Sequence, residues 1–333
     1  MIQRTVGPFA VHPISLGCMN LDHAYGPSVS AEQGERVLLG ALDAGYNFLD
    51  TATLYGGGKN ETRLGQVLKA HRSRYVLASK CGMAMVQQAD GSTKRVIDGR
   101  PATIKKQCED SLRRLNTEVI DLYYLHRWDK AVPIEDSVGA LSDLVKQGKI
   151  QSIGLSEVGE QTLRRAHAVH PIAALQTEYS LWTRDAEIAV LKATRELGIA
   201  FVAFSPVARG FLCGLRDLSG LDAKDIRRTM GRFNPDNYAA NLKLQDAYAR
   251  MAQQLSCSQA QLALAWLVQR APHIITIPGT RSPAHMQENM AAIDLQLGAD
   301  TLQQLDALIN PFTVQGARYD AQSQSEVDTE SAA

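Results

Sequence analysis

The sequence predicts an α/β fold, a single-domain (β/α)8 TIM barrel. Eight short apolar runs lie along the chain, helical periodicity separates them, and no glycine-rich dinucleotide fingerprint follows the first run. Strands that alternate with helices pair in parallel, and eight such units close into a barrel with the strand-to-helix loops at one mouth. An open doubly wound sheet is the structural alternative. We predict strands at residues 14–17, 47–50, 76–79, 121–126, 150–156, 174–178, 200–204 and 274–278.

The first segments decide between these two folds. Residues 5–11 predict a small β-hairpin ahead of the barrel, placed to plug its bottom. The first barrel strand is followed by Cys18-Met19-Asn20, so the G-x-G-x-x-G pattern of an open dinucleotide-binding sheet is missing. Tyr55-Gly56-Gly57-Gly58 follows the second strand and lacks the Walker pattern, so by itself it predicts a flexible loop.

The later segments alternate helices with strands up to residue 309. Two predicted helices show apolar residues at helical spacing, which would cover the outside of the sheet: Ile104, Cys108, Leu112 and Leu115 in one, and Ile134, Val138, Leu141 and Val145 in the other. Residues 210–241 form a long polar stretch after the seventh strand and predict a flap over a site. We place the barrel domain at residues 1–312, and we expect the polar tail 313–333 to be flexible.

Composition narrows the classes of function. Lys plus Arg and Asp plus Glu both number 35, so no overall field attracts nucleic acid or an anionic membrane, and a small-molecule ligand is favoured. The first residues lack a secretion signal and no apolar run could span a bilayer, which favours the cytoplasm. Five cysteines without a C-x-x-C pair argue against disulfides and zinc, and we expect no metal. The oligomeric state is left open.

Four polar residues stand at the ends of three successive strands, namely Asp50, Tyr55, Lys80 and His126. In a barrel these positions converge on the mouth, where catalytic side chains of this fold lie. Each residue alone is more readily explained as structural, but the four together suit proton delivery to a carbonyl oxygen. Lys80 would lower the pKa of Tyr55, Asp50 would keep Lys80 charged, and His126 would hydrogen-bond the substrate oxygen.

These four residues supply a proton but no hydride, so a cofactor must bring it. The rival chemistry is a lyase or aldolase in which Lys80 forms a Schiff base. Asp50 argues against that rival, because an amine must be neutral to attack a carbonyl.

These strand-end residues and the motifs around them resemble those of the aldo-keto reductase family, over nearly the whole chain from Gly17 to Asn289. Asn47-Phe48-Leu49-Asp50-Thr51-Ala52 with Tyr55-Gly56 is similar to the family's second-strand signature, and Glu61, Gly65 and Leu68 continue it. Asp121 to His126 is similar to the fourth strand, and Gly148-Lys149-Ile150 leading to Gly154-Leu155-Ser156 to the fifth. The resemblance implies a catalytic tetrad at Asp50, Tyr55, Lys80 and His126, with Tyr55 as the general acid in reduction.

The resemblance also implies an NADPH site. Ser156 and Gln176 would hold the nicotinamide carboxamide, and the ring would stack on Tyr179. Residues 205–212 are similar to the family's pyrophosphate loop, and residues 277–281 with Glu288 and Asn289 to its adenosine segment, in which Arg281 would face the 2′-phosphate. The cofactor contacts that we expect are therefore Ser156, Gln176, Tyr179, Ser205, Val207, Arg209, Gly210, Leu212, Gly279, Thr280, Arg281, His285, Glu288 and Asn289.

Two positions depart from the family pattern. Glu157 stands where many relatives have Asn beside the serine, and a carboxylate cannot donate to the carboxamide oxygen, so we assign it no cofactor contact. His285 stands where relatives often have Arg or Gln, so NADH is the second cofactor that the sequence allows. Cys18, Met19, Trp128 and Phe233 are expected to line an apolar pocket for aldehydes or ketones. The resemblance leaves one further alternative, a regulatory subunit that binds NADPH and turns over slowly.

Overall fold

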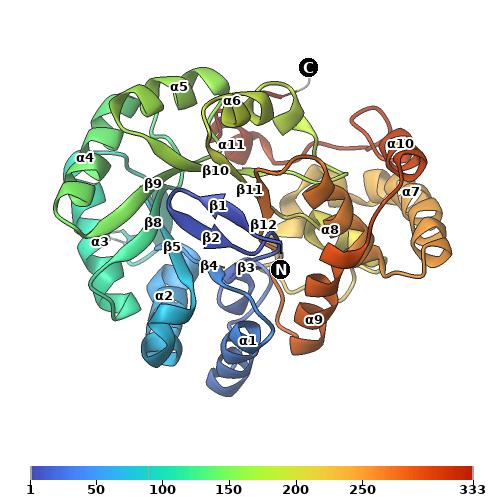
Figure 1. Cartoon of the computed structure of the whole chain (residues 1–333), viewed down its shortest axis with the longest axis horizontal. Helices are drawn as coiled ribbons and strands as arrows, with labels where there is room; N and C mark the ends of the chain where they lie inside the picture. The colour runs from blue at the N-terminus through green and yellow to red at the C-terminus, as the bar shows by residue number, and fades with distance from the viewer. Residues whose placement is uncertain (1, 89, 332–333) are drawn as a thin grey trace.

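An eight-stranded parallel sheet forms the centre of the molecule in the computed structural model, which describes residues 2–88 and 90–331 (Figure 1). The strands follow the order of the chain around the sheet. They are β3 (Leu16–Gly17), β4 (Phe48–Asp50), β5 (Val76–Cys81), β8 (Ile120–Leu125), β9 (Ile150–Ser156), β10 (Ile172–Glu178), β11 (Ala200–Phe204) and β12 (Ile274–Thr276).

The two edges of this sheet meet, which makes it a barrel. Ile14 and Thr276 form a parallel bridge, and Ser15 N donates to Thr276 O at 2.8 Å. The (β/α)8 fold predicted from the sequence is therefore confirmed, the open sheet is excluded, and each predicted strand coincides with an observed one apart from a few residues at the ends.

Helices cover the outside of the barrel (Figure 1). They are α1 (Ala31–Asp43), α2 (Lys59–Leu68), α3 (Pro101–Leu115), α4 (Ile134–Lys146), α5 (Glu160–Val169), α6 (Val190–Glu196) and α8 (Gln259–Gln269), with α7 (Pro235–Gln254), α9 (Pro283–Ala291) and α10 (Ala299–Leu308) beside them. The four residues predicted to form the apolar face of α3 are all buried, namely Ile104, Cys108, Leu112 and Leu115. The face of α4 is buried at Ile134, Val138 and Leu141, because apolar residues at helical spacing gain most by packing on the sheet.

The barrel floor is closed by the predicted hairpin, β1 (Arg4–Val6) and β2 (Phe9–Val11). Val6 and Val11 are fully buried and pack with Phe48, Leu122 and Val202 inside the barrel. Figure 1 shows this hairpin lying across one end of the barrel. Because the bottom is filled, a ligand can reach the interior only from the opposite mouth.

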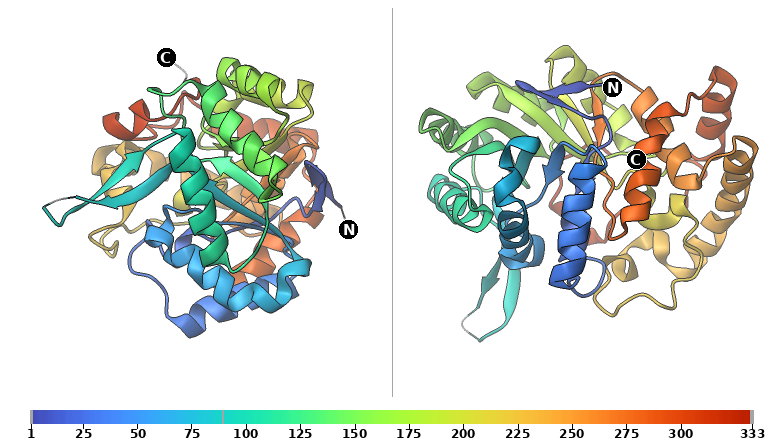
Figure 2. Two further views of the ribbon diagram at one scale, coloured as in Figure 1. Left: turned by 90° about the vertical axis from the view of Figure 1, so that its left-hand side faces the viewer. Right: turned by 60° about the horizontal axis from the view of Figure 1, so that its bottom comes forward.

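Two segments at the mouth differ from the sequence-based expectations. β6 (Met83–Gln87) and β7 (Thr93–Ile97) form an unpredicted hairpin after β5, which extends away from the barrel in Figure 2. The stretch 210–241 is not irregular throughout: α7 begins at Pro235, with Asn234 as its N-cap, since proline suits the first turn of a helix. Short 3-10 helices at Ile226–Thr229 and Gly231–Phe233 interrupt the remainder.

The chain after Pro311 packs against the mouth, which differs from the free tail that its composition suggests. It holds a short helix, α11 (Ala321–Ser325), and it buries Arg318, Val327 and Thr329. Asp328 N donates to Glu157 O at 2.9 Å. Within the described residues, no helix is long and apolar enough to cross a membrane.

Candidate active site

The predicted tetrad is assembled at the mouth. Lys80 Nζ donates to Asp50 Oδ1, to Thr51 O at 2.8 Å and to Tyr55 Oη at 3.1 Å. The rings of Tyr55 and His126 meet edge to face with their centroids 5.8 Å apart. Gln176 Nε2 donates to the second carboxylate oxygen of Asp50 at 2.8 Å, so both oxygens of this carboxylate have a donor.

A glycine turn presents Tyr55 to the site. Tyr55 begins a short 3-10 segment after β4, and the three glycines behind it have φ values of 60°, 64° and 92°. These angles lie in the left-handed region, which residues with a Cβ rarely adopt. The triple glycine that looked like a flexible loop is thus a tight turn that carries the phenol from the strand end to the start of α2.

Burial dominates the electrostatics of the tetrad. Burial raises the pKa of Tyr55 above its ordinary value, and Lys80 offsets only part of this. Lys80 thus acts in the expected direction, but the net lowering of this pKa that the sequence led us to expect is wrong. Burial also opposes charge on Lys80, but Asp50 and Tyr55 outweigh it and raise its pKa. Burial, followed by the charges of Lys80 and Arg127, holds the pKa of His126 well below its usual range, so its ring is neutral.

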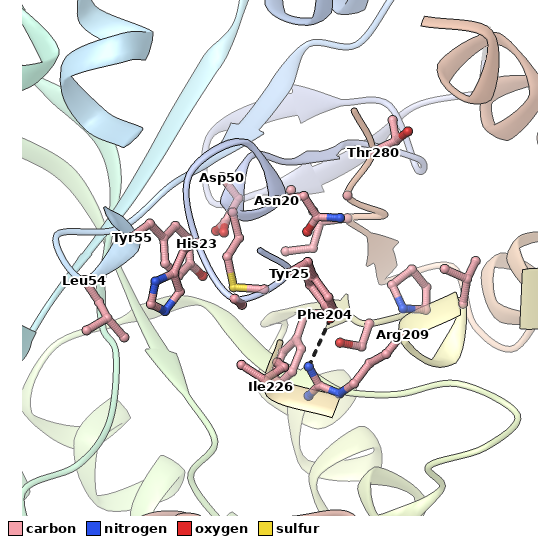
Figure 3. Close-up of a pocket in the computed structure, with 18 of the residues that line it drawn as sticks. Asn20, His23, Tyr25, Asp50, Leu54, Tyr55, Phe204, Arg209, Ile226 and Thr280 are labelled. Carbon is pink, nitrogen blue, oxygen red and sulfur yellow. Dashed lines mark hydrogen bonds between the residues drawn. The ribbon is translucent and has the colours of Figure 1, made fainter. Parts of the chain in front are cut away.

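A cavity of about 680 Å³ opens beside the tetrad (Figure 3). It is the size of a pocket for a cofactor or a small ligand. Of the residues predicted from the sequence, the following line it: Asp50, Tyr55, His126, Met19, Ser156, Gln176, Ser205, Val207, Arg209, Gly210, Gly279, Thr280, Arg281 and His285.

Tyr179, expected as the stacking ring for nicotinamide, does not line this cavity. Its ring is fully buried against Phe201 and Trp266, and its hydroxyl donates to Glu187 at 2.6 Å. Phe204, the last residue of β11, does line the cavity, and its ring has no hydroxyl (Figure 3). The sequence signal was available, because Phe204 directly precedes the predicted loop 205–212.

Six other predicted contacts also lie outside the cavity wall. Leu212 is buried under its own loop, and Glu288 and Asn289 lie further along α9. Cys18 is buried in the core. The indole of Trp128 donates to Val132 O at 2.9 Å instead of facing the cavity, and Phe233 packs on Trp182.

The cavity wall also contains residues that the sequence did not single out: His23, Tyr25, Leu54, Met83, Arg95, Arg127, Ile226, Arg227, Tyr319, Ser323 and Glu326. They come from the loops after β3, β4, β8 and β11, from the β6–β7 hairpin and from the C-terminal segment. These residues lie together because the loops fold over the mouth of the barrel. The spacing of residues along the chain does not predict how the loops fold, so it could not identify this part of the wall.

Arg209 and Glu157 belong to a buried ion-pair network. Arg209 donates to Glu178 Oε2 at 2.8 Å and to Tyr25 Oη at 3.3 Å, the contact dashed in Figure 3. Arg318 donates to Glu157 at 2.5 Å and to Glu178 at 3.1 Å. Burial opposes ionisation of Glu178, but Arg209 and Arg318 outweigh it and lower its pKa to about 2. Glu157 therefore anchors the C-terminal segment and does not face the cavity.

Comparison with known proteins agrees with this geometry. The model of the aldo/keto reductase family matches residues 13–310. A probable aldo-keto reductase 1 from Glycine max is 38% identical over 312 residues, covering 93% of this chain and 89% of the relative.

Solved structures give the same picture. The glycerol dehydrogenase AKR11B4 from Gluconobacter oxydans superposes with a TM-score of 0.84 at 26% identity, over 92% of this chain and 94% of that one. An aldo/keto reductase from Klebsiella pneumoniae, solved in complex with NADP and acetate, superposes with a TM-score of 0.71 at 28% identity, over 95% and 97% of the two chains.

Proposed function

We propose that this chain, which belongs to the aldo/keto reductase family and is an NAD(P)H-dependent oxidoreductase, reduces aldehydes or ketones to alcohols. In this proposal Tyr55 is the general acid. The observation that carries the proposal is the fully buried Lys80, which bonds both Asp50 and Tyr55 beside a cavity of cofactor size. NADPH is the cofactor of the family, and a relative of this chain has been solved with NADP.

The cavity wall fits such a cofactor. At one end, Ser156 and Gln176 offer polar groups for a carboxamide, and Phe204 offers a ring on which nicotinamide can stack. Elsewhere the wall includes residues 205–207, Arg209, Gly210, Arg281 and the start of α9, where Ser282 and His285 lie. A helix N-terminus beside a guanidinium attracts phosphate. Phe204 thus takes the role that the sequence assigned to Tyr179.

When bound in this site, NADPH would supply the hydride for the carbonyl carbon. The residues of the chain handle the proton. Tyr55 holds its phenol hydrogen, because its pKa is raised, and donates it to the carbonyl oxygen as charge develops there. Lys80 then stabilises the phenolate at hydrogen-bond distance, and Asp50 keeps the ammonium in place. The neutral ring of His126 has one N–H to offer to the same carbonyl oxygen, which orients the substrate.

Lys80 does not suit the rival Schiff-base chemistry. An amine nucleophile must lose its proton, whereas the Asp50 carboxylate and Tyr55 raise the pKa of Lys80 in spite of its burial. The pairing therefore favours an electrostatic role for this ammonium.

Stopped-flow mixing of NADPH-loaded protein with a panel of aldehydes and ketones tests the proposal. Tyr55→Phe keeps the ring but removes the acidic hydrogen, so we expect single-turnover oxidation of NADPH to slow at least ~100-fold. Tyr75→Phe is the matched control, because this buried phenol lies outside the cavity. Unchanged oxidation in Tyr55→Phe would exclude the acid role.

A further inference from the structure

Two arginines outside the tetrad line the cavity near Tyr55 and His126; we call this part of the cavity the substrate end. Arg95 comes from β7, and Arg127 directly follows His126. Both line the cavity that contains Tyr55 and His126. Their charges reach the reacting groups, because Arg127 contributes to lowering the pKa of Tyr55 against its burial and both arginines contribute to lowering that of His126.

Both guanidiniums have hydrogen-bond capacity to spare. A guanidinium carries five N–H donors. In the described part of the chain, Arg127 donates only through Nη1, to His126 O at 2.8 Å and to Ser156 Oγ at 3.2 Å. Arg95 donates only through Nη2, to Glu326 Oε2 on the C-terminal segment. The Arg95 side chain is 37% exposed, so a molecule in the cavity can reach it.

The charges at this end of the cavity leave a surplus of one cation. Among the described residues of the wall, the carboxylates are those of Glu326, which pairs with Arg95, and Asp50, which pairs with Lys80. Arg127 forms no ion pair in the described part of the chain. The two histidines at this end of the cavity do not change this balance. The ring of His126 is neutral, and the pKa of His23 is lowered by its burial and then by the charge of Arg95, which favours a neutral ring there as well. Asp320 also lies near Arg95, but its carboxylate caps α11 and does not line the cavity.

We propose that this end of the cavity is an anion subsite, and that the preferred substrates are aldehydes or ketones that carry a carboxylate or phosphate group. Arg95 and Arg127 hold this anion, since a guanidinium binds the oxygens of either group with two parallel hydrogen bonds. Glu326 is an internal competitor that the substrate anion displaces from Arg95. The inference rests on the proposed carbonyl reduction and names its substrate class. It also replaces the purely apolar pocket expected from the sequence, of whose four residues only Met19 lines the cavity.

Matched pairs of substrates test the subsite. The ratio of kcat/KM for 4-carboxybenzaldehyde to that for 4-methylbenzaldehyde measures the preference for a carboxylate, and glyceraldehyde 3-phosphate against glyceraldehyde measures that for a phosphate. We expect at least one ratio to exceed about ten in the wild type, equivalent to about 1.4 kcal/mol. The pair with the higher ratio identifies the anion.

Three variants separate the subsite from general effects. Arg95→Gln should lower the higher ratio about tenfold, which again corresponds to about 1.4 kcal/mol. Glu326→Gln should raise it, because the competing carboxylate is gone. Lys94→Gln is the matched control: it removes the same charge from the neighbouring position of β7, outside the cavity wall, and should leave the ratio as it is.

The outcomes distinguish this inference from the proposed function. If no carbonyl compound oxidises NADPH, the proposed function itself fails. If neutral and anionic aldehydes are reduced with equal kcat/KM, or if Arg95→Gln and Glu326→Gln both leave the ratio unchanged, reduction stands and the anion subsite is overturned.

Discussion

Replacing Lys80 by Met tests the buried ion pair at the centre of the site. The side chain of Lys80 is fully buried and that of Asp50 is 2% exposed, so water cannot replace the ammonium when it is removed. Asp50 would keep one donor, Gln176 Nε2 at 2.8 Å. The variant therefore leaves a buried carboxylate that is hydrogen-bonded but has no countercharge.

The expected cost follows from that geometry. Breaking a buried ion pair by removing one partner typically costs about 3 to 5 kcal/mol of stability. Because Gln176 remains, we expect Lys80→Met to lose about 3 kcal/mol. Lys80→Met with Asp50→Asn removes both charges and should recover more than half of that loss. Reduction should stay impaired in both variants, at least ~100-fold, because neither can stabilise the phenolate of Tyr55.

Urea unfolding, followed by tryptophan fluorescence, measures the first effect, and single-turnover oxidation of NADPH the second. A Lys80→Met protein as stable as the wild type would refute the argument that this pair is energetically coupled. A double variant that regains activity along with stability would show that the ammonium serves folding alone.

The remaining predictions concern the cofactor, the C-terminal segment and pH. Arg281→Ala should weaken NADPH binding at least tenfold more than NADH binding in fluorescence titrations, and equal losses would refute the 2′-phosphate contact. Arg318→Met leaves Glu157 buried without a countercharge, whereas Glu178 keeps its ion pair with Arg209. The variant should therefore cost about 3 kcal/mol and expose residues 317–331 to limited proteolysis; an unchanged cleavage rate would contradict this. Burial lowers the pKa of His126 in the folded protein, so below pH ~6.5 the unfolded chain binds a proton that the folded protein does not. The free energy of unfolding should therefore fall as the pH drops, by up to about 1.4 kcal/mol per pH unit more in the wild type than in His126→Gln. Urea midpoints of the two proteins that run parallel from pH 7 to pH 5 would exclude this linkage.

The sequence predicted the barrel and the tetrad because both depend on strand position. A residue at the end of a parallel strand in a closed barrel can only lie at the mouth. Asp50, Lys80 and His126 occupy such positions, and the glycine turn brings Tyr55 to them. The alternation of strands and helices was therefore enough to predict that these four side chains lie close together.

The parts that the sequence did not predict depend on contacts between distant loops. Composition gave no indication that Arg318 would bridge Glu157 and Glu178, because a polar tail has the same composition whether it packs or stays free. The assignment of the stacking ring to Tyr179 was wrong for a related reason. Tyr179 follows β10, but its ring packs on Phe201 and Trp266 in the core, whereas Phe204 lines the cavity.

The opposing effects of burial and charge on Tyr55 explain how this site can use a phenol as an acid. A phenolate has no proton to give to a carbonyl oxygen, and at neutral pH Tyr55 would be a phenolate only if Lys80 lowered its pKa by about three units. Burial instead raises this pKa, so in the proposed mechanism the hydrogen stays on Tyr55 until the substrate oxygen gains negative charge. Lys80, already within 3.1 Å, would then stabilise the phenolate without having to move. In the proposed mechanism the ammonium therefore acts on the product of the proton transfer, and Asp50, itself hydrogen-bonded by Gln176, keeps the ammonium in place.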